Sequence, residues 1–303
     1  MTEKQRLSLL IKQRAAELGF SACGIVKAEA VSTTARKQFE EWIAQGAHGE
    51  MGYMARNIEK RMDPTQLVEG CRTIIVVAQN YYSRTSSPNI SLYAQGTDYH
   101  RVIKDKLFLL LEYINSHTLV KGRAFCDSAP VAERYWAAQA GIGTCGRNRQ
   151  LIIPGRGTHF FLGELIIDAE AEYDTPLQES LCNNCNACIK SCPTGALSEN
   201  SFDARRCLSY LTIEYRGELP PATGEQMEEC IYGCDKCQRA CPHNRMAEPH
   251  NEPQFTPSDA LLAMNGEGWK NLTKEKFDKL FKDSAVQRCG YEQLMRNIKA
   301  SKL

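Results

Sequence analysis

The stretch Cys182-Asn183-Asn184-Cys185-Asn186-Ala187-Cys188-Ile189-Lys190-Ser191-Cys192-Pro193 decides how the centre of this chain folds. Its Cys-x2-Cys-x2-Cys-x3-Cys-Pro spacing is that of bacterial ferredoxins, in which closely spaced thiolates hold a 4Fe–4S cluster. A second run, Cys234-x2-Cys237-x3-Cys241-Pro242, has the form of the matching half. Together the two runs predict two 4Fe–4S clusters.

A zinc ribbon is the competing interpretation, because it also uses Cys-x2-Cys pairs. It explains neither the third cysteine of the first run, Cys188, nor the Cys-Pro ending of both runs. The spacing therefore favours iron–sulfur clusters over zinc.

The cysteine before proline in each run is expected to bind the cluster of the other run, as in two-cluster ferredoxins. Cys230 stands four residues before Cys234, where ferredoxin pairs normally stand three apart, so spacing weakly disfavours it as a ligand. Cys207 is the other candidate for the last position. The expected ligands of the first cluster are Cys182, Cys185, Cys188 and Cys241, and those of the second are Cys192, Cys234, Cys237 and either Cys207 or Cys230.

The composition is ordinary for a soluble globular protein. The 303 residues are 43% hydrophobic and 24% charged, and the net charge of +1 implies no global attraction to a polyanion. The apolar positions Leu7, Leu10, Ile11 and Leu18 predict an amphipathic N-terminal helix rather than a signal peptide. Fourteen cysteines without an export signal indicate metal rather than disulfides. We expect a cytoplasmic protein that does not span a membrane.

The chain divides into three expected parts. Residues 1–175 combine β-branched runs with amphipathic helices, which predicts an α/β domain. Residues 176–245 form the cysteine-rich domain, and residues 246–303 form a proline-containing connection and a short helical tail. In the first part the expected strands are 73–78, 123–126 and 162–168, and the expected helices are 104–115 and 131–140.

The tail is basic, with nine Lys or Arg against four acidic residues after Gly268. A solvated helical face would have this composition, and so would a surface that binds RNA phosphates. If the tail binds RNA, the leading residues are Arg288, Arg296 and Lys299.

Two clusters pass single electrons but do not by themselves activate a substrate. The α/β domain must therefore hold another redox centre, bind a substrate, or do both. The glycine run Gly141-Ile142-Gly143 follows an expected helix rather than a strand, which disfavours a dinucleotide-binding fold.

Short motifs occur from near the start of the chain to its end. They are His48-Gly49-Glu50-Met51-Gly52-Tyr53-Met54, Arg61-Met62-Asp63-Pro64, Tyr93-Ala94-Gln95-Gly96-Thr97-Asp98-Tyr99-His100, Asp127-Ser128-Ala129-Pro130-Val131-Ala132-Glu133-Arg134, Arg206-Cys207-Leu208-Ser209-Tyr210-Leu211-Thr212-Ile213-Glu214, Tyr232-Gly233-Cys234-Asp235 and Arg296-Asn297. In combination they closely resemble the epoxyqueuosine reductases, which are cobalamin-dependent iron–sulfur enzymes of tRNA modification. No single motif would be specific.

The resemblance implies reduction of the epoxide of epoxyqueuosine, at the wobble position of tRNA anticodons, to queuosine. It implies base-off cobalamin in an α/β cobalamin-binding domain (1–175), next to one cluster of an inserted ferredoxin-like domain (176–245). An external donor would supply electrons through the two 4Fe–4S clusters. The expected partners are thus a tRNA anticodon stem-loop and that donor, and we expect a monomer.

The resemblance also implies roles for single residues. Asp127 matches the family's proton donor, and Arg61 and Arg134 match positions near the corrinoid. Ser209 is a further cofactor-binding candidate, and the segment that contains it selects Cys207 as the last cluster ligand. Without the resemblance, Asp127 could be a helix N-cap and the two arginines could be surface ion-pair partners.

The chain departs from the family pattern in two places. Gly146-Arg147-Asn148 stands where Gly-Lys-Asn is common, and Ser91-Leu92-Tyr93-Ala94 stands where Ser-Arg-Tyr-Ala is frequent. Some members carry C-terminal HEAT repeats that this chain lacks, so we expect the core and tail to hold tRNA. Two other functions remain as alternatives: a reductive dehalogenase-like corrinoid enzyme, which the missing export signal disfavours, and an electron-transfer protein that reduces a partner's corrinoid.

Overall fold

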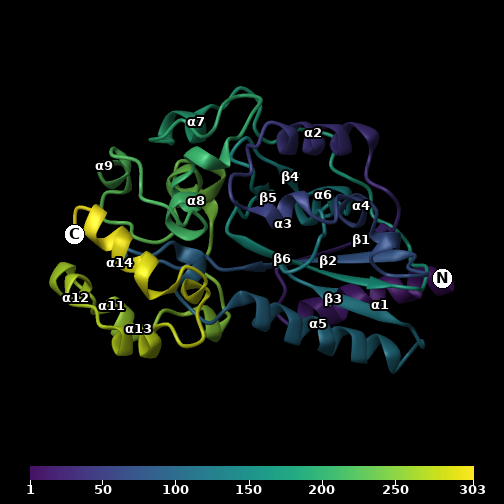
Figure 1. The fold of residues 1–303 in the computed structure, drawn as a ribbon. Helices are drawn as coiled ribbons and strands as arrows, with labels where there is room; N and C mark the ends of the chain where they lie inside the picture. Colours follow the sequence, from purple (N-terminus) through teal and green to yellow (C-terminus); the bar gives the residue numbers. More distant parts are fainter.

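The computed structural model describes residues 1–303, and a four-stranded sheet lies at its centre (Figure 1). The strand order is β1-β2-β6-β3, and every neighbouring pair is antiparallel. The two central strands are buried on both faces, which explains why their sequences are continuous apolar runs. The strands are β1 (Ala22–Lys27), β2 (Thr73–Asn80), β3 (Gly122–Phe125) and β6 (Phe160–Ile167).

Two layers of helices cover the sheet. α1 (Glu3–Glu17) and α5 (Tyr99–Asn115) lie on one face, and α2 (Thr33–Ala44), α6 (Glu133–Gln139) and the hairpin β4 (Thr144–Cys145)–β5 (Leu151–Ile152) lie on the other (Figure 1). Successive residues of β2 alternate between the two faces: Ile75 and Val77 belong to the larger core, and Ile74 and Val76 belong to the smaller one. The sheet therefore separates two hydrophobic cores.

The strands and helices expected in the first 175 residues are all present. The runs 73–78, 123–126 and 162–168 correspond to β2, β3 and β6, and 104–115 and 131–140 correspond to α5 and α6. α5 begins earlier than expected, at Tyr99, because the Asp98 side chain caps it by accepting from the His100 N–H group. None of the helices is both long and apolar enough to cross a membrane.

Short helices build the rest of the molecule. The N-terminal part contains α3 (Gly52–Ala55) and α4 (Ile58–Met62) beside the sheet. The cysteine-rich part contains α7 (Ala187–Ser191), α8 (Leu208–Ile213), α9 (Thr223–Met227) and α10 (Lys236–Arg239). The tail contains α11 (Asp259–Leu262), α12 (Gly266–Lys270), α13 (Lys274–Leu280) and α14 (Gly290–Ala300).

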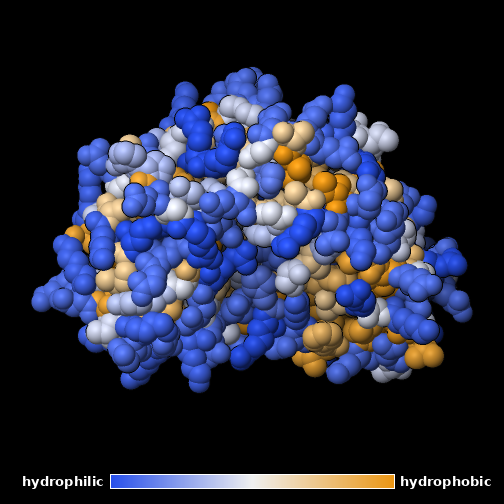
Figure 2. Space-filling view, in the orientation of Figure 1, coloured by the Kyte–Doolittle hydropathy of each residue, from blue (hydrophilic) through white to orange (hydrophobic).

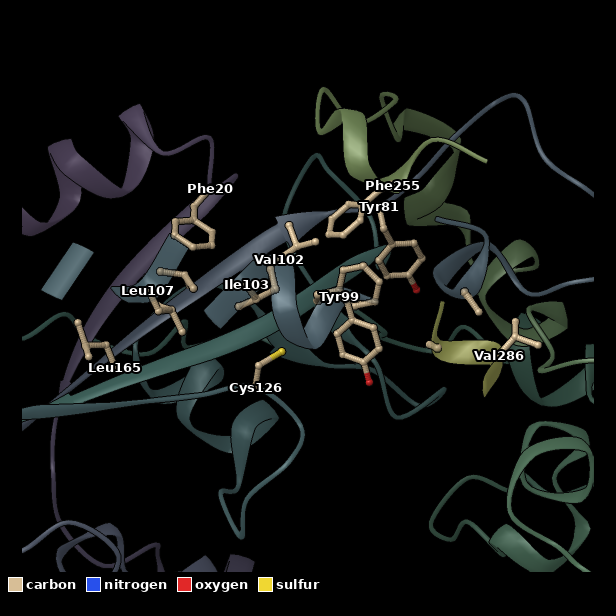
Figure 3. Close-up of a cluster of buried hydrophobic side chains, with 14 of the residues drawn as sticks. Phe20, Tyr81, Tyr99, Val102, Ile103, Leu107, Cys126, Leu165, Phe255 and Val286 are labelled. Carbon is tan, nitrogen blue, oxygen red and sulfur yellow. The ribbon is translucent and has the colours of Figure 1, made fainter. Parts of the chain in front are cut away.

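The tail is not a free solvated helix. Its side chains Trp269, Phe277 and Val286 belong to the same buried cluster as Ile103 of α5, and Figure 3 shows Val286 beside the aromatic end of that cluster.

The structure contradicts the choice of Arg296 as an RNA contact. Its guanidinium group is half-buried and donates to the carbonyl oxygens of Leu211 (2.7 Å), Tyr215 (2.8 Å) and Gly217 (2.6 Å).

A short parallel bridge connects the sheet part to the cysteine-rich part. The Ile231 N–H donates to the Asn89 carbonyl, and the Ser91 N–H donates to the Tyr232 carbonyl, both at 2.8 Å. Gly233 permits this approach, because its φ is +76° and a Cβ there would lie 2.5 Å from Ser91. The bridge fixes the second cysteine run against residues 89–92.

Most of the surface in view is hydrophilic, and hydrophobic residues gather toward the lower right, where Figure 1 places β3 and α5 (Figure 2). The exposed apolar residues of α5 are Phe108 and Leu109, with exposed fractions of 50% and 46%.

Candidate active site and cluster cavities

Cysteines from both runs line one small cavity of about 40 Å³. A 4Fe–4S cluster needs four thiolates around one space, which this cavity provides. The cavity's cysteines are Cys182, Cys185, Cys188 and Cys241, the set expected for the first cluster.

Arg147 closes this cavity from the side of the sheet. Its backbone N–H donates to the Cys182 Sγ at 3.3 Å. Its guanidinium group donates to the carbonyls of Cys185 (3.3 Å) and Asn183 (3.2 Å) and to the Asn186 side chain. A lysine, which is common in the family here, could not bridge these groups with a planar fork. This departure from the family pattern therefore ties the first cysteine loop to the sheet part.

Cys207 and Cys230 have different surroundings. The Cys207 thiol lies within electrostatic range of the thiols of Cys192, Cys234 and Cys237. The Cys230 thiol lies within electrostatic range of Cys234 alone among them, and it donates to the carbonyls of Tyr232 (3.5 Å) and Gly233 (3.6 Å). The structure thus gathers Cys207 with the three remaining cysteines of the two runs.

Thr212 holds the two segments of this second cysteine group together. Its hydroxyl donates to the Leu208 carbonyl at 2.8 Å and accepts from the Gly233 N–H at 3.0 Å. Cys207 directly precedes α8, and Cys234 directly follows Gly233, so this bond sets their separation. Ser209 lies half-buried on the same helix, and its hydroxyl makes no hydrogen bond.

Asp127 begins the loop between β3 and α6. Its φ is +49°, a left-handed conformation that is uncommon for a residue other than glycine. The side chain is 59% exposed. The interpretation of Asp127 as a helix N-cap is wrong, because Ala132 occupies that position of α6. The positive φ and the accessible carboxylate make Asp127 a candidate functional residue.

Neighbours on α5 and α6 fix the position of Asp127. The Tyr99 hydroxyl donates to the Asp127 Oδ2 at 2.5 Å, and the Tyr99 ring stacks on Phe161 with 4.2 Å between centroids. Figure 3 shows Tyr99 at the aromatic end of the large core. The His100 Nε2 lies 3.9 Å from the same oxygen. The Asp127 N–H donates to the Glu133 Oε1 at 2.5 Å.

Two acidic side chains near Asp127, those of Glu133 and Glu164, are desolvated. Burial, followed by the charge of Asp127, raises the pKa of Glu133 to about 8. Glu164 in β6 is fully inaccessible, and burial raises its pKa well above the ordinary value. Both of its carboxyl oxygens lack a hydrogen-bond partner. Burial therefore favours the protonated form of both groups.

Arg61 and Arg134 approach the same acids. Arg61 in α4 is half-buried, and its Nη1 donates to the Val131 carbonyl at 3.2 Å. Its Nε is buried without a partner, and burial lowers the pKa of the guanidinium group. Arg134 follows Glu133 on α6 and is exposed. The structure thus brings Asp127, Arg61 and Arg134 together around Glu133, with Ser209 in the cysteine-rich part.

Comparisons with known proteins identify two matching family models. The model described as epoxyqueuosine reductase QueG, DUF1730 matches residues 61–128, and that of a 4Fe-4S double cluster binding domain matches residues 181–244. The epoxyqueuosine reductase of Cyclobacterium marinum is 41% identical over 98% of this chain and 97% of its own length. That of Escherichia coli is 38% identical over 97% of this chain and 80% of its own. The chain belongs to the epoxyqueuosine reductase family.

Solved epoxyqueuosine reductases share the fold of this family member. One, with a tRNA-Tyr epoxyqueuosine-modified stem loop, has a TM-score of 0.87 at 26% identity and covers 97% of this chain and 80% of its own. The Streptococcus thermophilus enzyme has a TM-score of 0.85 at 29% identity, and the match covers 98% of this chain and 80% of that enzyme. A catabolic reductive dehalogenase shares only the general fold, with a TM-score of 0.53 at 17% identity.

Sequence reasoning missed several residues that the structure of this family member places near Asp127. Arg288 lies 5.4 Å above the Tyr53 ring, and its Nε donates to the Glu214 Oε1 at 2.6 Å. Both Tyr53 and Arg288 lie close enough to Asp127 to interact with it electrostatically. Tyr53 and Glu214 lie within quoted motifs, but nothing in the sequence indicates that they meet. Tyr99, Glu133 and Glu164 were also missed as parts of the site.

Proposed function

We propose that this chain reduces the epoxide of epoxyqueuosine in tRNA to queuosine, with cobalamin and two 4Fe–4S clusters as cofactors. The observation that carries the proposal is Asp127, an accessible carboxylate with a positive φ, held by Tyr99 and Glu133 and close to the buried Glu164. The family membership supplies the reaction. The solved relative with an epoxyqueuosine-modified stem loop supports a tRNA anticodon as the substrate.

Asp127 is proposed to protonate the epoxide oxygen as the carbon–oxygen bond breaks. Overall, the epoxide takes up two electrons and two protons, and it becomes an alkene with loss of water. Without a proton the departing oxygen would be an alkoxide, which leaves poorly, so a nearby acid lowers the barrier. A Bacillus subtilis relative has been solved with its catalytic aspartate loop swung out of the active site, which supports a role for an aspartate on such a loop.

The two cysteine groups are the proposed cluster sites, and they would pass electrons from an external donor one at a time. The convergence of the first group on one cavity and the place of Cys207 in the second support these sets. The proposed ligands are Cys182, Cys185, Cys188 and Cys241 for the first cluster, and Cys192, Cys207, Cys234 and Cys237 for the second.

Arg61, Arg134 and Ser209 are proposed to hold cobalamin. The buried Arg61 Nε without a partner and the unbonded Ser209 hydroxyl fit a ligand rich in amide carbonyls, because each has unused hydrogen-bonding capacity. Bound cobalamin would supply the strongly reducing cobalt centre that the chemistry requires. The residues of the chain would orient the epoxide, exclude water and place the Asp127 proton.

Two other functions are less well supported. Reductive dehalogenases share the fold only at 17% identity, and this chain covers 38% of the compared one. A protein that only transferred electrons would need neither the strained Asp127 nor the Tyr99 hydrogen bond that holds it.

A single-turnover assay tests the proposal. Anaerobic enzyme carrying both clusters and cobalamin would be mixed with a reductant and a stem-loop RNA that contains epoxyqueuosine. We expect the wild type to form queuosine and Asp127→Asn to react about 10²–10⁴ times more slowly with unchanged iron and corrinoid content. Asp105→Asn, at an exposed position of α5, is the matched control. Normal conversion by Asp127→Asn, or full activity without corrinoid, would contradict the proposal.

A further inference from the structure

The turn between β4 and β5 lines the cavity of the first cysteine group with two polar residues. Besides the four cysteines, the polar residues of the lining are Arg147, Asn148 and His243. The His243 Nε2 lies 2.9 Å from the Leu181 carbonyl, so a backbone group already occupies that nitrogen. Arg147 and Asn148 remain, and the proposed function gives neither of them a chemical role.

Asn148 has an unused hydrogen-bond donor at this cavity. The residue is only 5% exposed, and its Oδ1 accepts from the Gln150 N–H at 3.2 Å. Its Nδ2 is buried without a hydrogen-bond partner in the protein. A buried amide N–H group that stays unpaired costs free energy, so this donor implies an acceptor inside the cavity. The sulfur atoms of a cluster held by the four cysteines are acceptors of this kind.

Arg147 contributes a backbone donor and a positive charge. Its backbone N–H donates to the Cys182 Sγ at 3.3 Å. Its half-buried guanidinium group is held only by neutral acceptors, which are the carbonyls of Asn183 and Cys185 and the side-chain oxygen of Asn186. It forms no ion pair with a carboxylate. The protein therefore leaves the charge of Arg147 uncompensated beside four thiols.

Backbone hydrogen bonds fix the turn that carries these donors. The Gly146 N–H donates to the Gln150 carbonyl at 2.8 Å, and the Arg149 N–H donates to the Gly146 carbonyl at 2.9 Å. A Cβ at Gly146 would lie 2.8 Å from the Asn148 Oδ1, so the turn requires glycine there. The donors are thus held in place by the fold, as groups that surround a metal site and tune it usually are.

We propose that Arg147 and Asn148 raise the reduction potential of the cluster that the first cysteine group holds. The inference rests on the proposed cluster site. A 4Fe–4S cluster becomes more negative when it accepts one electron from the external donor, and its potential depends on nearby charge and on hydrogen bonds to sulfur. A positive charge and N–H donors stabilise the reduced form more than the oxidised form. A weaker reductant can then reduce this cluster.

The arginine at position 147 allows the charge to be separated from the anchoring of the cysteine loop. Arg147→Lys keeps the positive charge but lacks the planar fork that joins three acceptors. Arg147→Met removes both the charge and the fork. If the charge sets the potential, the lysine variant should stay close to the wild type and the methionine variant should not. A purely structural role would affect both variants alike.

A redox titration of the anaerobically purified enzyme tests the proposal, with the reduced clusters followed by electron paramagnetic resonance. We expect one of the two midpoint potentials to become more negative in Arg147→Met and in Asn148→Asp. Asn148→Asp keeps the oxygen that accepts from Gln150 and replaces the donor by a charged oxygen. Each shift should lower the ratio of reduced to oxidised cluster at a fixed potential about tenfold, which is about 59 mV for one electron.

Arg156→Met is the matched control. Arg156 follows β5, is exposed, and donates to the Ser21 carbonyl, so it does not line the cavity. The control removes one positive charge that solvent screens, and it should shift neither midpoint potential. The midpoint of the second cluster is an internal reference in every variant, because neither Arg147 nor Asn148 makes a hydrogen bond to the second cysteine group.

The proposal is overturned if both midpoints stay unchanged in Arg147→Met and Asn148→Asp, or if both midpoints shift equally. A midpoint potential does not depend on the fraction of molecules that hold a cluster, so a variant that loses part of its iron can still be interpreted. A wild type that holds both clusters but does not convert RNA would refute the proposed reaction alone. A wild type without the first cluster would refute the cluster site, and this inference with it.

Discussion

Single residues of the site were only partly predictable from the sequence. Asp127 was found because it follows a predicted strand inside a recognisable motif. Glu164 lies in a run that was predicted correctly as a strand, but the pattern of apolar residues did not indicate that this acid would be buried in the sheet. Glu133 and Tyr99 become site residues only through contacts between segments far apart in the chain, and such contacts leave no local signal.

Glu164→Gln should alter the pH dependence of stability. The folded protein keeps the Glu164 proton above the ordinary glutamate pKa of about 4.3, whereas the unfolded chain releases it there. Wild-type stability therefore falls as the pH rises above that value, by up to about 1.4 kcal/mol per pH unit for one proton, until the folded carboxyl group ionises. The variant lacks this loss, so its Tm should exceed that of the wild type by a margin that grows with pH. Parallel Tm curves would contradict the raised pKa.

At the scale of elements, the prediction was best where periodicity is strong. The long helix α5 and the buried strands β2 and β6 were identified within a few residues, but strand direction and order were not, because they depend on pairing between distant segments. The motif 48–54 shows the same limit. Gly49 has φ +59°, and a Cβ there would lie 2.5 Å from the Tyr210 hydroxyl, which accepts from the Glu50 N–H at 2.9 Å.

The loops around the second cysteine group allow a direct test of the proposed ligands. Cys207→Ala should remove one cluster and with it half of the iron, because Cys207 stands among the other three thiols. Cys230→Ala should keep all of the iron, because that thiol is hydrogen-bonded to backbone carbonyls. Iron analysis and the visible spectrum after anaerobic purification would show the difference. The reverse pattern would assign the position to Cys230.

At the scale of the whole molecule, the tail differs most from its sequence-based description. The count of basic residues after Gly268 is correct, but it does not reveal which face is buried. In α14, Leu294 and Ile298 enter the main core, and the basic side chains divide between structural and exposed positions. Arg296 is structural because its donors satisfy carbonyls at the end of α8, whereas Lys299 is exposed and forms no ion pair within 4.0 Å.

Arg296→Ala and Lys299→Ala should therefore separate folding from RNA binding. Arg296→Ala should lower the free energy of unfolding by about 1–3 kcal/mol, because it leaves partly buried carbonyls without a donor, and should not change the salt dependence of RNA binding. Lys299→Ala should change stability by less than about 0.5 kcal/mol. If Lys299 contacts a phosphate, that variant should reduce the slope of log affinity against log salt by roughly one. Binding of the anticodon stem-loop at several salt concentrations, together with thermal unfolding, measures both effects.

A flatter salt slope in Arg296→Ala with unchanged stability would restore Arg296 as an RNA contact, because only a free guanidinium group could produce that combination.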